Sequence, residues 1–201
     1  MMTRRLAKFT GAVMATLAVP TLAFAHTGLG ETTGFTHGFQ HPISGLDHIL
    51  AMVMVGVFAV QLGRRALWLV PSTFVLVMAV GGALGAMGVA VPFVETGIAL
   101  SVVVLGAVVA LGIKAPSAIA MGIVGLFAIF HGHAHGAEMP EDAGGFAYAT
   151  GFMIATALLH VVGIAIGFLV GRGSERRGQI VTQATGGLAA LAGVGLLSGL
   201  L

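Results

Sequence analysis

Residues 151–170 read GFMIATALLHVVGIAIGFLV, twenty residues without an Asp, Glu, Lys or Arg. An α-helix rises about 1.5 Å per residue, so this stretch matches the hydrocarbon core of a bilayer, which is about 30 Å thick. In hydrocarbon, every backbone N–H and C=O group must find a partner within the protein, and a single apolar segment can satisfy its own groups only as a helix. The stretch therefore predicts a membrane-spanning helix.

The composition of the whole chain agrees with this prediction. Of its 201 residues, 57% are hydrophobic and only 8% are charged, and the mean hydropathy is +1.04. Soluble domains carry about 25% charged residues, so this composition excludes a soluble surface. The pI is near 9.7, but the net charge is only +2 and the cations are scattered between apolar runs. We therefore expect no nucleic acid as a partner.

Apolar segments of spanning length recur between short polar breaks. We predict an all-α polytopic membrane protein in which residues 26–201 form a single domain of six transmembrane helices. The approximate ranges of these helices are 43–62, 66–89, 96–113, 117–137, 146–170 and 180–200. The Gly- and Thr-rich stretch before them, residues 26–40, is expected to be an exported arm or to line the mouth of the bundle.

Glycines spaced four residues apart allow two helix backbones to approach closely. This spacing occurs in three segments, and we expect each of them to pack tightly against a neighbouring helix. The glycines are Gly81 and Gly85; Gly163, Gly167 and Gly171; and Gly195 and Gly199.

The N-terminus has the pattern of a cleaved export signal. Three cations precede an apolar run over residues 9–22, and the small-residue pattern Ala23-Phe24-Ala25 follows it. We predict that residues 1–25 are a signal peptide and that His26 is the mature N-terminus. The alternative is an uncleaved first helix, for which an apolar run of about 14 residues is short.

The charges in the breaks predict the orientation. If the mature N-terminus is exported, all remaining Lys and Arg residues fall in cytoplasmic breaks, and the exported breaks carry only acids. The cations are Arg64, Arg65, Lys114, Arg172, Arg176 and Arg177, and the acids are Glu31, Glu95, Glu138, Glu141 and Asp142. We therefore expect a multi-pass protein of the bacterial inner membrane with both mature termini in the periplasm. We attribute Glu95 to the N-terminus of the third helix, where a negative charge is favourable.

Two stretches place ionisable side chains where a lipid-embedded chain should have none. They are HPISGLDH at His41–His48 and FHGHAHGAE at Phe130–Glu138. Ionisable groups in transmembrane segments are costly and usually line a cavity that serves transport or catalysis. The chain has no cysteine, so a metal ion here would be held by nitrogen and oxygen.

Helical spacing predicts that these groups face one another. Pro42 suits the first turn of a helix, so we expect the first helix to begin there, with His41 and His48 on one face. In the fourth helix, His131, His135 and Glu138 lie at i, i+4 and i+7 and also share a face. Because these two helices are antiparallel, they carry their imidazoles at one level below the exported surface.

Spacing alone does not assign a place in this cluster to three further residues. Asp47 could bind metal directly, or it could orient an imidazole by accepting its other N–H. His133 could belong to a second ion position or hydrogen-bond to a neighbour. His160 lies about fourteen residues into the fifth helix, which is about 21 Å of helix rise. We expect it to be a lower station on a stepwise route for the ion.

At these residues the chain resembles a known family. His41-Pro42-x-x-Gly45-x-Asp47-His48 and Phe130-His131-Gly132-x-Ala134-His135-Gly136-x-Glu138 are similar to the two signatures of HupE/UreJ membrane proteins, nickel permeases linked to hydrogenase and urease maturation. The similarity extends over the mature chain, and Thr156-Ala157-Leu158-Leu159-His160 also fits the family. The resemblance implies that the metal residues are His41, Asp47, His48, His131, His135 and Glu138. His26, His37 and His133 fall outside the shared positions.

The predicted function is a secondary transporter, or permease, for uptake of Ni(II), with no enzyme activity and no cofactor. Its metal residues would be the six above together with His160. Imidazole with carboxylate also suits Co(II) and Zn(II), so cobalt or another divalent transition metal is an alternative substrate. The expected partners are this ion and the lipid bilayer, and the sequence is also compatible with a homo-oligomer.

Two other classes of protein are less favoured by the sequence. In an intramembrane zinc-dependent hydrolase, Gly132 would stand where H-E-x-x-H has its catalytic Glu. A haem-binding electron carrier with paired axial histidines would leave the carboxylates next to these histidines without a role.

Overall fold

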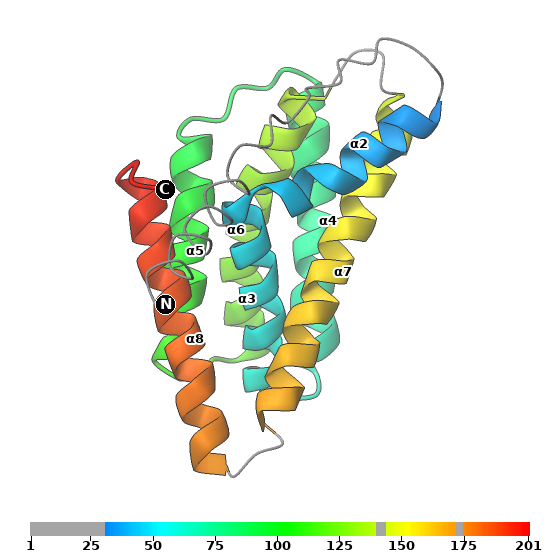
Figure 1. Ribbon diagram of the computed structural model, residues 1–201. Coiled ribbons are helices and arrows are strands. Elements are labelled where there is room, and N and C mark those ends of the chain that lie inside the picture. The colour runs from blue at the N-terminus through cyan, green and yellow to red at the C-terminus, as the bar shows by residue number, and fades with distance from the viewer. Residues whose placement is uncertain (1–30, 140–143, 172–174) are drawn as a thin grey trace, which may run out of the picture.

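The computed structural model describes residues 31–139, 144–171 and 175–201, and these form seven helices and no strand (Figure 1). The helices are α2 Glu31–Ser44, α3 Leu46–Leu62, α4 Ala66–Ala86, α5 Val94–Ala110, α6 Ser117–Ala137, α7 Gly145–Gly171 and α8 Glu175–Leu197. The predicted signal peptide and His26 lie outside the described residues. Residues 31–40, which belong to the stretch expected to be an exported arm or mouth lining, are part of helix α2.

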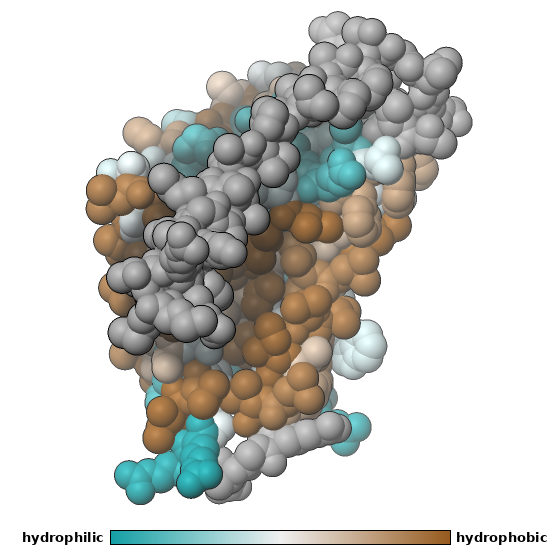
Figure 2. All heavy atoms as spheres, in the orientation of Figure 1, coloured by the Kyte–Doolittle hydropathy of each residue, from teal (hydrophilic) through white to brown (hydrophobic). Residues whose placement is uncertain are grey.

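Helix α3 is the centre of the bundle. It packs against α4, α5, α7 and α8, while α2 crosses the top of the bundle in Figure 1 and lies against α7. The buried side chains of α3 are almost all apolar, and they include Met52, Val55 and Phe58. Figure 2 shows apolar residues around the side of the molecule and hydrophilic residues at its two ends. Such a distribution suits a protein surrounded by lipid.

The described helices confirm the all-helical membrane fold but not the number of spans. Four segments are long and apolar enough to cross a membrane: α4, α6, Gly145–Val170 of α7 and Arg176–Leu197 of α8. Helices α2 and α3 reach that length only as a bent pair, and α5 has 17 residues. The structure thus supports four spans, or five if the bent pair is one span. The count of six remains a prediction.

The first helix does not begin at Pro42 as expected. Pro42 lies near the end of α2, and Gly45 has extended backbone between α2 and α3, which meet at 80°. His41 and His48 are therefore separated by a corner and do not share a helix face. The predicted shared face requires one continuous helix over residues 41–48, and it is wrong because the chain turns at Gly45.

Two of the three glycine segments pack as predicted. A Cβ on Gly81 or Gly85 of α4 would meet the backbone of α6, and a Cβ on Gly163 of α7 would meet the backbone of α3. The third prediction is wrong, because Gly195 faces only the side chain of Leu201, and Gly199 is a left-handed residue in open space.

The charges separate between the two ends of the bundle. The breaks that follow α3 and α5 lie at the same end as the start of α8, and this basic end carries the exposed Arg64, Arg65, Lys114, Arg176 and Arg177. Glu95 and Glu138 lie at the opposite, acidic end, together with Asp47. Three predicted loop charges, Arg172, Glu141 and Asp142, lie outside the described residues.

Candidate metal centre

The acidic end of the bundle contains a polar cavity of about 230 Å³ where α2, α3, α5 and α6 meet. It is lined by five of the seven predicted metal residues, His41, Asp47, His48, His135 and Glu138, and also by Glu95. No Lys or Arg among the described residues lines this cavity. Three carboxylates around one cavity concentrate cations there.

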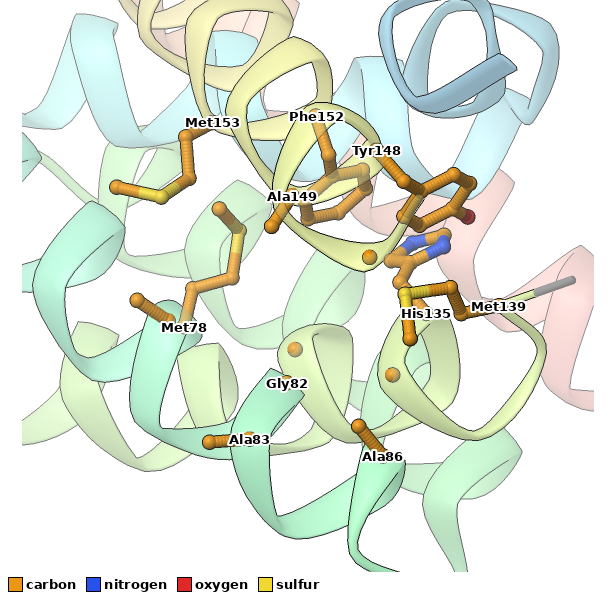
Figure 3. Close-up of a pocket in the computed structure, with 14 residues that line it drawn as sticks. Met78, Gly82, Ala83, Ala86, His135, Met139, Tyr148, Ala149, Phe152 and Met153 are labelled. Carbon is orange, nitrogen blue, oxygen red and sulfur yellow. The ribbon is translucent and has the colours of Figure 1, made fainter. Parts of the chain in front are cut away.

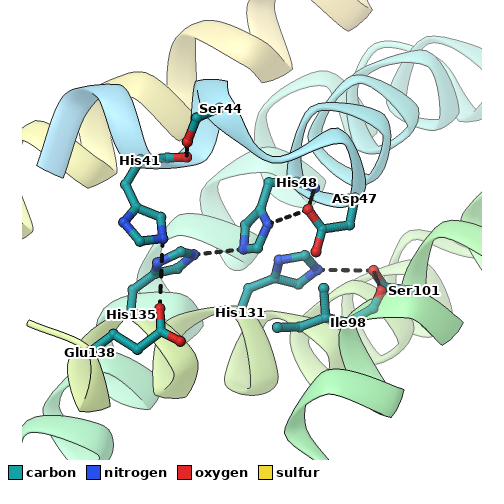
Figure 4. Close-up of polar contacts among 9 residues, drawn as sticks. All are labelled: His41, Ser44, Asp47, His48, Ile98, Ser101, His131, His135 and Glu138. Atoms are coloured by element: carbon teal, nitrogen blue, oxygen red, sulfur yellow. Dashed lines mark hydrogen bonds and ion pairs between the residues drawn. The ribbon is translucent and has the colours of Figure 1, made fainter. Parts of the chain in front are cut away.

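His135 is the residue on which the cluster converges (Figure 4). Its ring centroid lies 4.5 Å from that of His41 and 4.5 Å from that of His48, and its Nε2 lies 2.6 Å from Nε2 of His48. His41, His135 and Glu138 each offer a ligand atom, and these three atoms lie within 4.8 Å of one another. Helices α2, α3 and α6 thus each contribute an imidazole to one place.

Asp47 fixes the orientation of the His48 ring. The ring Nδ1–H and the backbone N–H of His48 both donate to Asp47 Oδ1, each at 2.8 Å. The lone pair of His48 therefore lies on Nε2, which faces His135. This is the arrangement in which a carboxylate orients a metal-binding imidazole.

Ser101 determines the tautomer of His131 in a similar way. The Ser101 hydroxyl donates to the carbonyl of Ile98 at 2.6 Å, so its oxygen accepts from Nε2–H of His131 at 2.9 Å. The Nδ1 of His131 then carries a lone pair, and it is buried without a hydrogen-bond partner among the described residues. The His131 ring lies 4.8 Å from that of His48, which extends the cluster inward.

Tyr148 of α7 supports His41 from outside the cluster. Its hydroxyl lies 3.4 Å from Nδ1 of His41, while Nε2 of the same ring lies 3.7 Å from Glu138 Oε2. A Cβ on Gly38 of α2 would meet the backbone carbonyl of Tyr148, so this glycine lets α2 lie directly on α7. The contact places His41 above His135.

The spacing of the two facing nitrogens is close to what a shared metal ion requires. Two imidazole nitrogens bound at about 2.1 Å to a tetrahedral ion are about 3.4 Å apart. The Nε2 atoms of His48 and His135 are 2.6 Å apart, so each ring needs to move outward by only a few tenths of an ångström. The Nδ1 of His135 has no partner among the described residues and can take the proton that Nε2 gives up.

Glycines hold α6 so that its histidines face the cluster. Gly132 and Gly136 follow His131 and His135 in sequence, and a Cβ on either would meet a backbone carbonyl of α4. These glycines let α4 lie against one side of α6. The imidazoles project from an adjacent side, toward α3 and α5.

A second cavity also reaches His135 but has different chemistry. It measures about 280 Å³ between α4, α6 and α7 and is lined by small residues and three methionines. Figure 3 shows Met139 beside the His135 ring, with Met78 and Met153 farther away. Its lining is apolar apart from His135 and the hydroxyl of Tyr148. A divalent ion prefers the polar cavity, where nitrogen and carboxylate oxygen are both present.

His133 and His160 lie outside the cluster. His133 Nε2 lies 2.6 Å from the backbone carbonyl of Val89, so of the two alternatives for His133 the structure has the hydrogen bond. His160 is 1% exposed, and neither of its ring nitrogens has a partner among the described residues. It lies against Phe74, not against the other histidines.

Four residues of this region were not recognised as part of the site from the sequence. They are Glu95, which lines the cavity as well as starting α5, and Ser101, Tyr148 and Phe74. Ser101 and Tyr148 carried a usable signal, because each is a polar side chain in a strongly apolar segment. Phe74 carried none, because an aromatic residue in an apolar helix is ordinary.

Comparison with known proteins agrees with the two His-rich signatures. Residues 14–196 match the model of the HupE / UreJ protein family. The chain belongs to the HupE/UreJ family. It is 50% identical over 186 residues to Protein HupE of Rhizobium leguminosarum bv. viciae, which covers 92% of this chain and 95% of that protein. No solved structure matches this HupE/UreJ chain.

The predicted resemblance is thus confirmed. HupE/UreJ proteins form a family of membrane transporters, which agrees with the prediction that the chain is not an enzyme. The metal-binding role of each residue stays a prediction.

Proposed function

We propose that this chain is a secondary transporter that takes up Ni(II) across the inner membrane. One observation carries the proposal: His48 and His135, from two different helices, direct their Nε2 atoms at each other from 2.6 Å at the base of an acidic cavity. Without an ion, the two rings share one proton in a single hydrogen bond, whereas a divalent ion would use a lone pair from each ring. Family membership supports transport, since the family generally handles nickel or cobalt.

The route begins at the mouth of the cavity. Glu95 and Glu138 attract the hydrated cation, and His41, half-buried at the edge of the cavity, exchanges with bound water. Closer in, His48 and His135 replace more of the water, with Asp47 nearby to balance charge. His131 and then His160 offer the next lone pairs inward. Stepwise replacement of water by protein ligands avoids the full cost of placing a bare ion in hydrocarbon.

The donor set is compatible with Co(II) as an alternative cargo. Imidazole with carboxylate binds both ions, and affinity rises only moderately from Co(II) to Ni(II) in the general order of divalent metals. A single transport experiment with both ions in competition separates these two cargoes.

The central test is nickel accumulation in cells that lack other high-affinity nickel uptake. His48→Ala and His135→Ala should each reduce accumulation of radioactive nickel at low external concentration to the background of cells without the protein, while membrane levels of the protein stay unchanged. His37→Ala is the matched control, because His37 is exposed on α2 and outside the cluster. Normal accumulation in both cluster variants would refute the proposal.

A further inference from the structure

Phe74 of α4 lies between the upper histidines and His160. Its ring centroid is 5.6 Å from that of His131 and 5.2 Å from that of His160, and its side chain is fully buried. Counted along their helices from the acidic end, His131, Phe74 and His160 lie about 9, 18 and 22 Å deep. The phenyl ring is therefore next in depth after His131, directly before His160.

Phe74 contacts a histidine on the side of each of two cavities. The polar cavity ends at His48 and His135, and a groove of about 400 Å³ between α4 and α7 reaches His160 from the basic half of the bundle. Phe74 lines neither of them. One turn toward the acidic end, Met78 is also buried, and its sulfur lies 3.7 Å from the hydroxyl of Thr156, one turn before His160. Met78 also lines the apolar cavity that reaches His135, so Phe74 is the buried α4 side chain whose ring contacts both His131 and His160.

The nitrogens on either side of Phe74 are unpaired. Nδ1 of His131 and both ring nitrogens of His160 are buried without partners among the described residues. A phenyl ring has no lone pair for a divalent ion, so Phe74 gives an ion no ligand between His131 and His160, both of whose rings it contacts. A buried aromatic side chain changes rotamer only when its neighbours yield, because protein interiors are tightly packed.

We propose that Phe74 is the gate of the transport route, a side chain that holds the ion at the upper histidines and controls its transfer to His160. The proposal rests on the proposed function, since it assigns a barrier within the same route. It predicts that flux and binding respond differently to the size of residue 74. Flux should rise when the side chain is smaller and fall when it is larger, while the affinity of the upper site stays the same.

The test uses the purified full chain in detergent and in proteoliposomes. Nickel affinity is measured by calorimetry and nickel influx by a dye enclosed in the vesicles. Phe74→Ala should raise the initial influx about tenfold and Phe74→Trp should lower it about tenfold, a change of barrier height of about 1.4 kcal/mol in each direction. Both should bind nickel as tightly as the wild type. Phe74→Leu keeps most of the apolar volume, guards against a folding defect, and should give an intermediate rise.

Phe58→Ala is the matched control, because Phe58 is equally buried in α3 and has no ring contact with a described histidine. It should leave both influx and affinity close to the wild type. Influx that is unchanged, or that moves in the same direction in Phe74→Ala and Phe74→Trp, overturns the gate. Loss of nickel binding in all three Phe74 variants also overturns it, since Phe74 would then shape the upper site. A wild-type protein that moves no nickel would instead reject the proposed function itself, and the gate with it.

Discussion

At the scale of single residues, the cluster depends on how each imidazole is held. Three of the imidazoles have one ring nitrogen next to a carboxylate or hydroxyl group. The pairs are His48 with Asp47, His131 with Ser101, and His41 with Tyr148. These contacts leave the other nitrogen of each ring for an ion. Pre-orientation of this kind lowers the cost of ordering the ligands when the ion binds.

Removing one orienting group should weaken binding without removing a ligand atom. Asp47→Ala frees the His48 ring to rotate and to change tautomer, so nickel affinity should fall by about 10- to 100-fold, as for other residues that orient metal ligands. Calorimetric titration of the purified protein measures this. Glu95→Ala removes a charge from the same cavity but no hydrogen bond to a described histidine, so its effect should be clearly smaller. Equal losses in both variants would mean that Asp47 acts only through its charge.

At the scale of helices, the sequence predicted the apolar elements well. Helix α6 has the predicted bounds, 117–137, and α7 agrees to within a residue at each end. Helix α2 was missed because its Gly- and Thr-rich sequence favours no helix by itself. Close packing on α7, where Gly38 and Gly151 let the backbones touch, stabilises it instead. That contact is tertiary and leaves no periodic signal in the sequence.

For the candidate site, the sequence predicted which side chains lie together better than it predicted how they are arranged. His131, His135 and Glu138 follow one helix, so spacing along that helix placed them correctly. His41 and His48 are close for another reason, the corner at Gly45, because both rings contact His135 across it. Which rings meet depends on the angle between α2 and α3, and one extended glycine sets that angle.

The fit of α6 against α4 should matter as much as the ligands. Gly136→Ala places a Cβ against the backbone carbonyl of Gly82, which must push α4 away and displace His135. We expect a loss of stability of about 1–3 kcal/mol, typical of overpacking, together with weaker nickel binding.

Gly122→Ala is the control in the same helix, since a Cβ there meets nothing within 4 Å. Alanine also favours the helix over glycine, by about 1 kcal/mol. This variant should therefore be as stable as the wild type or slightly more stable. Thermal unfolding in detergent compares the two variants, and an equal response would show that the α4–α6 contact does not position the site.

At the scale of the whole molecule, the separation of charge between the two ends predicts the orientation. Because the chain has no cysteine, single cysteines can report on each end without background. Phe93 is exposed at the acidic end and Lys114 is exposed at the basic end, so the two reporters are Phe93→Cys and Lys114→Cys. A membrane-impermeant maleimide applied to intact spheroplasts should label only the Phe93 variant. Labelling of the Lys114 variant alone would reverse the orientation and make the acidic cavity face the cytoplasm.

The same orientation determines what drives uptake. An inside-negative potential of 100 mV contributes about 2.3 kcal/mol per charge, so about 4.6 kcal/mol for a divalent ion moving inward, enough for an accumulation of more than a thousandfold. In proteoliposomes, a potassium diffusion potential set by valinomycin should therefore accelerate nickel influx when the inside is negative and suppress it when the potential is reversed. A pH step imposed at zero potential is the control. Influx that follows the pH step and ignores the potential would mean that two protons leave for each ion that enters, and that the pH gradient drives uptake instead of the potential.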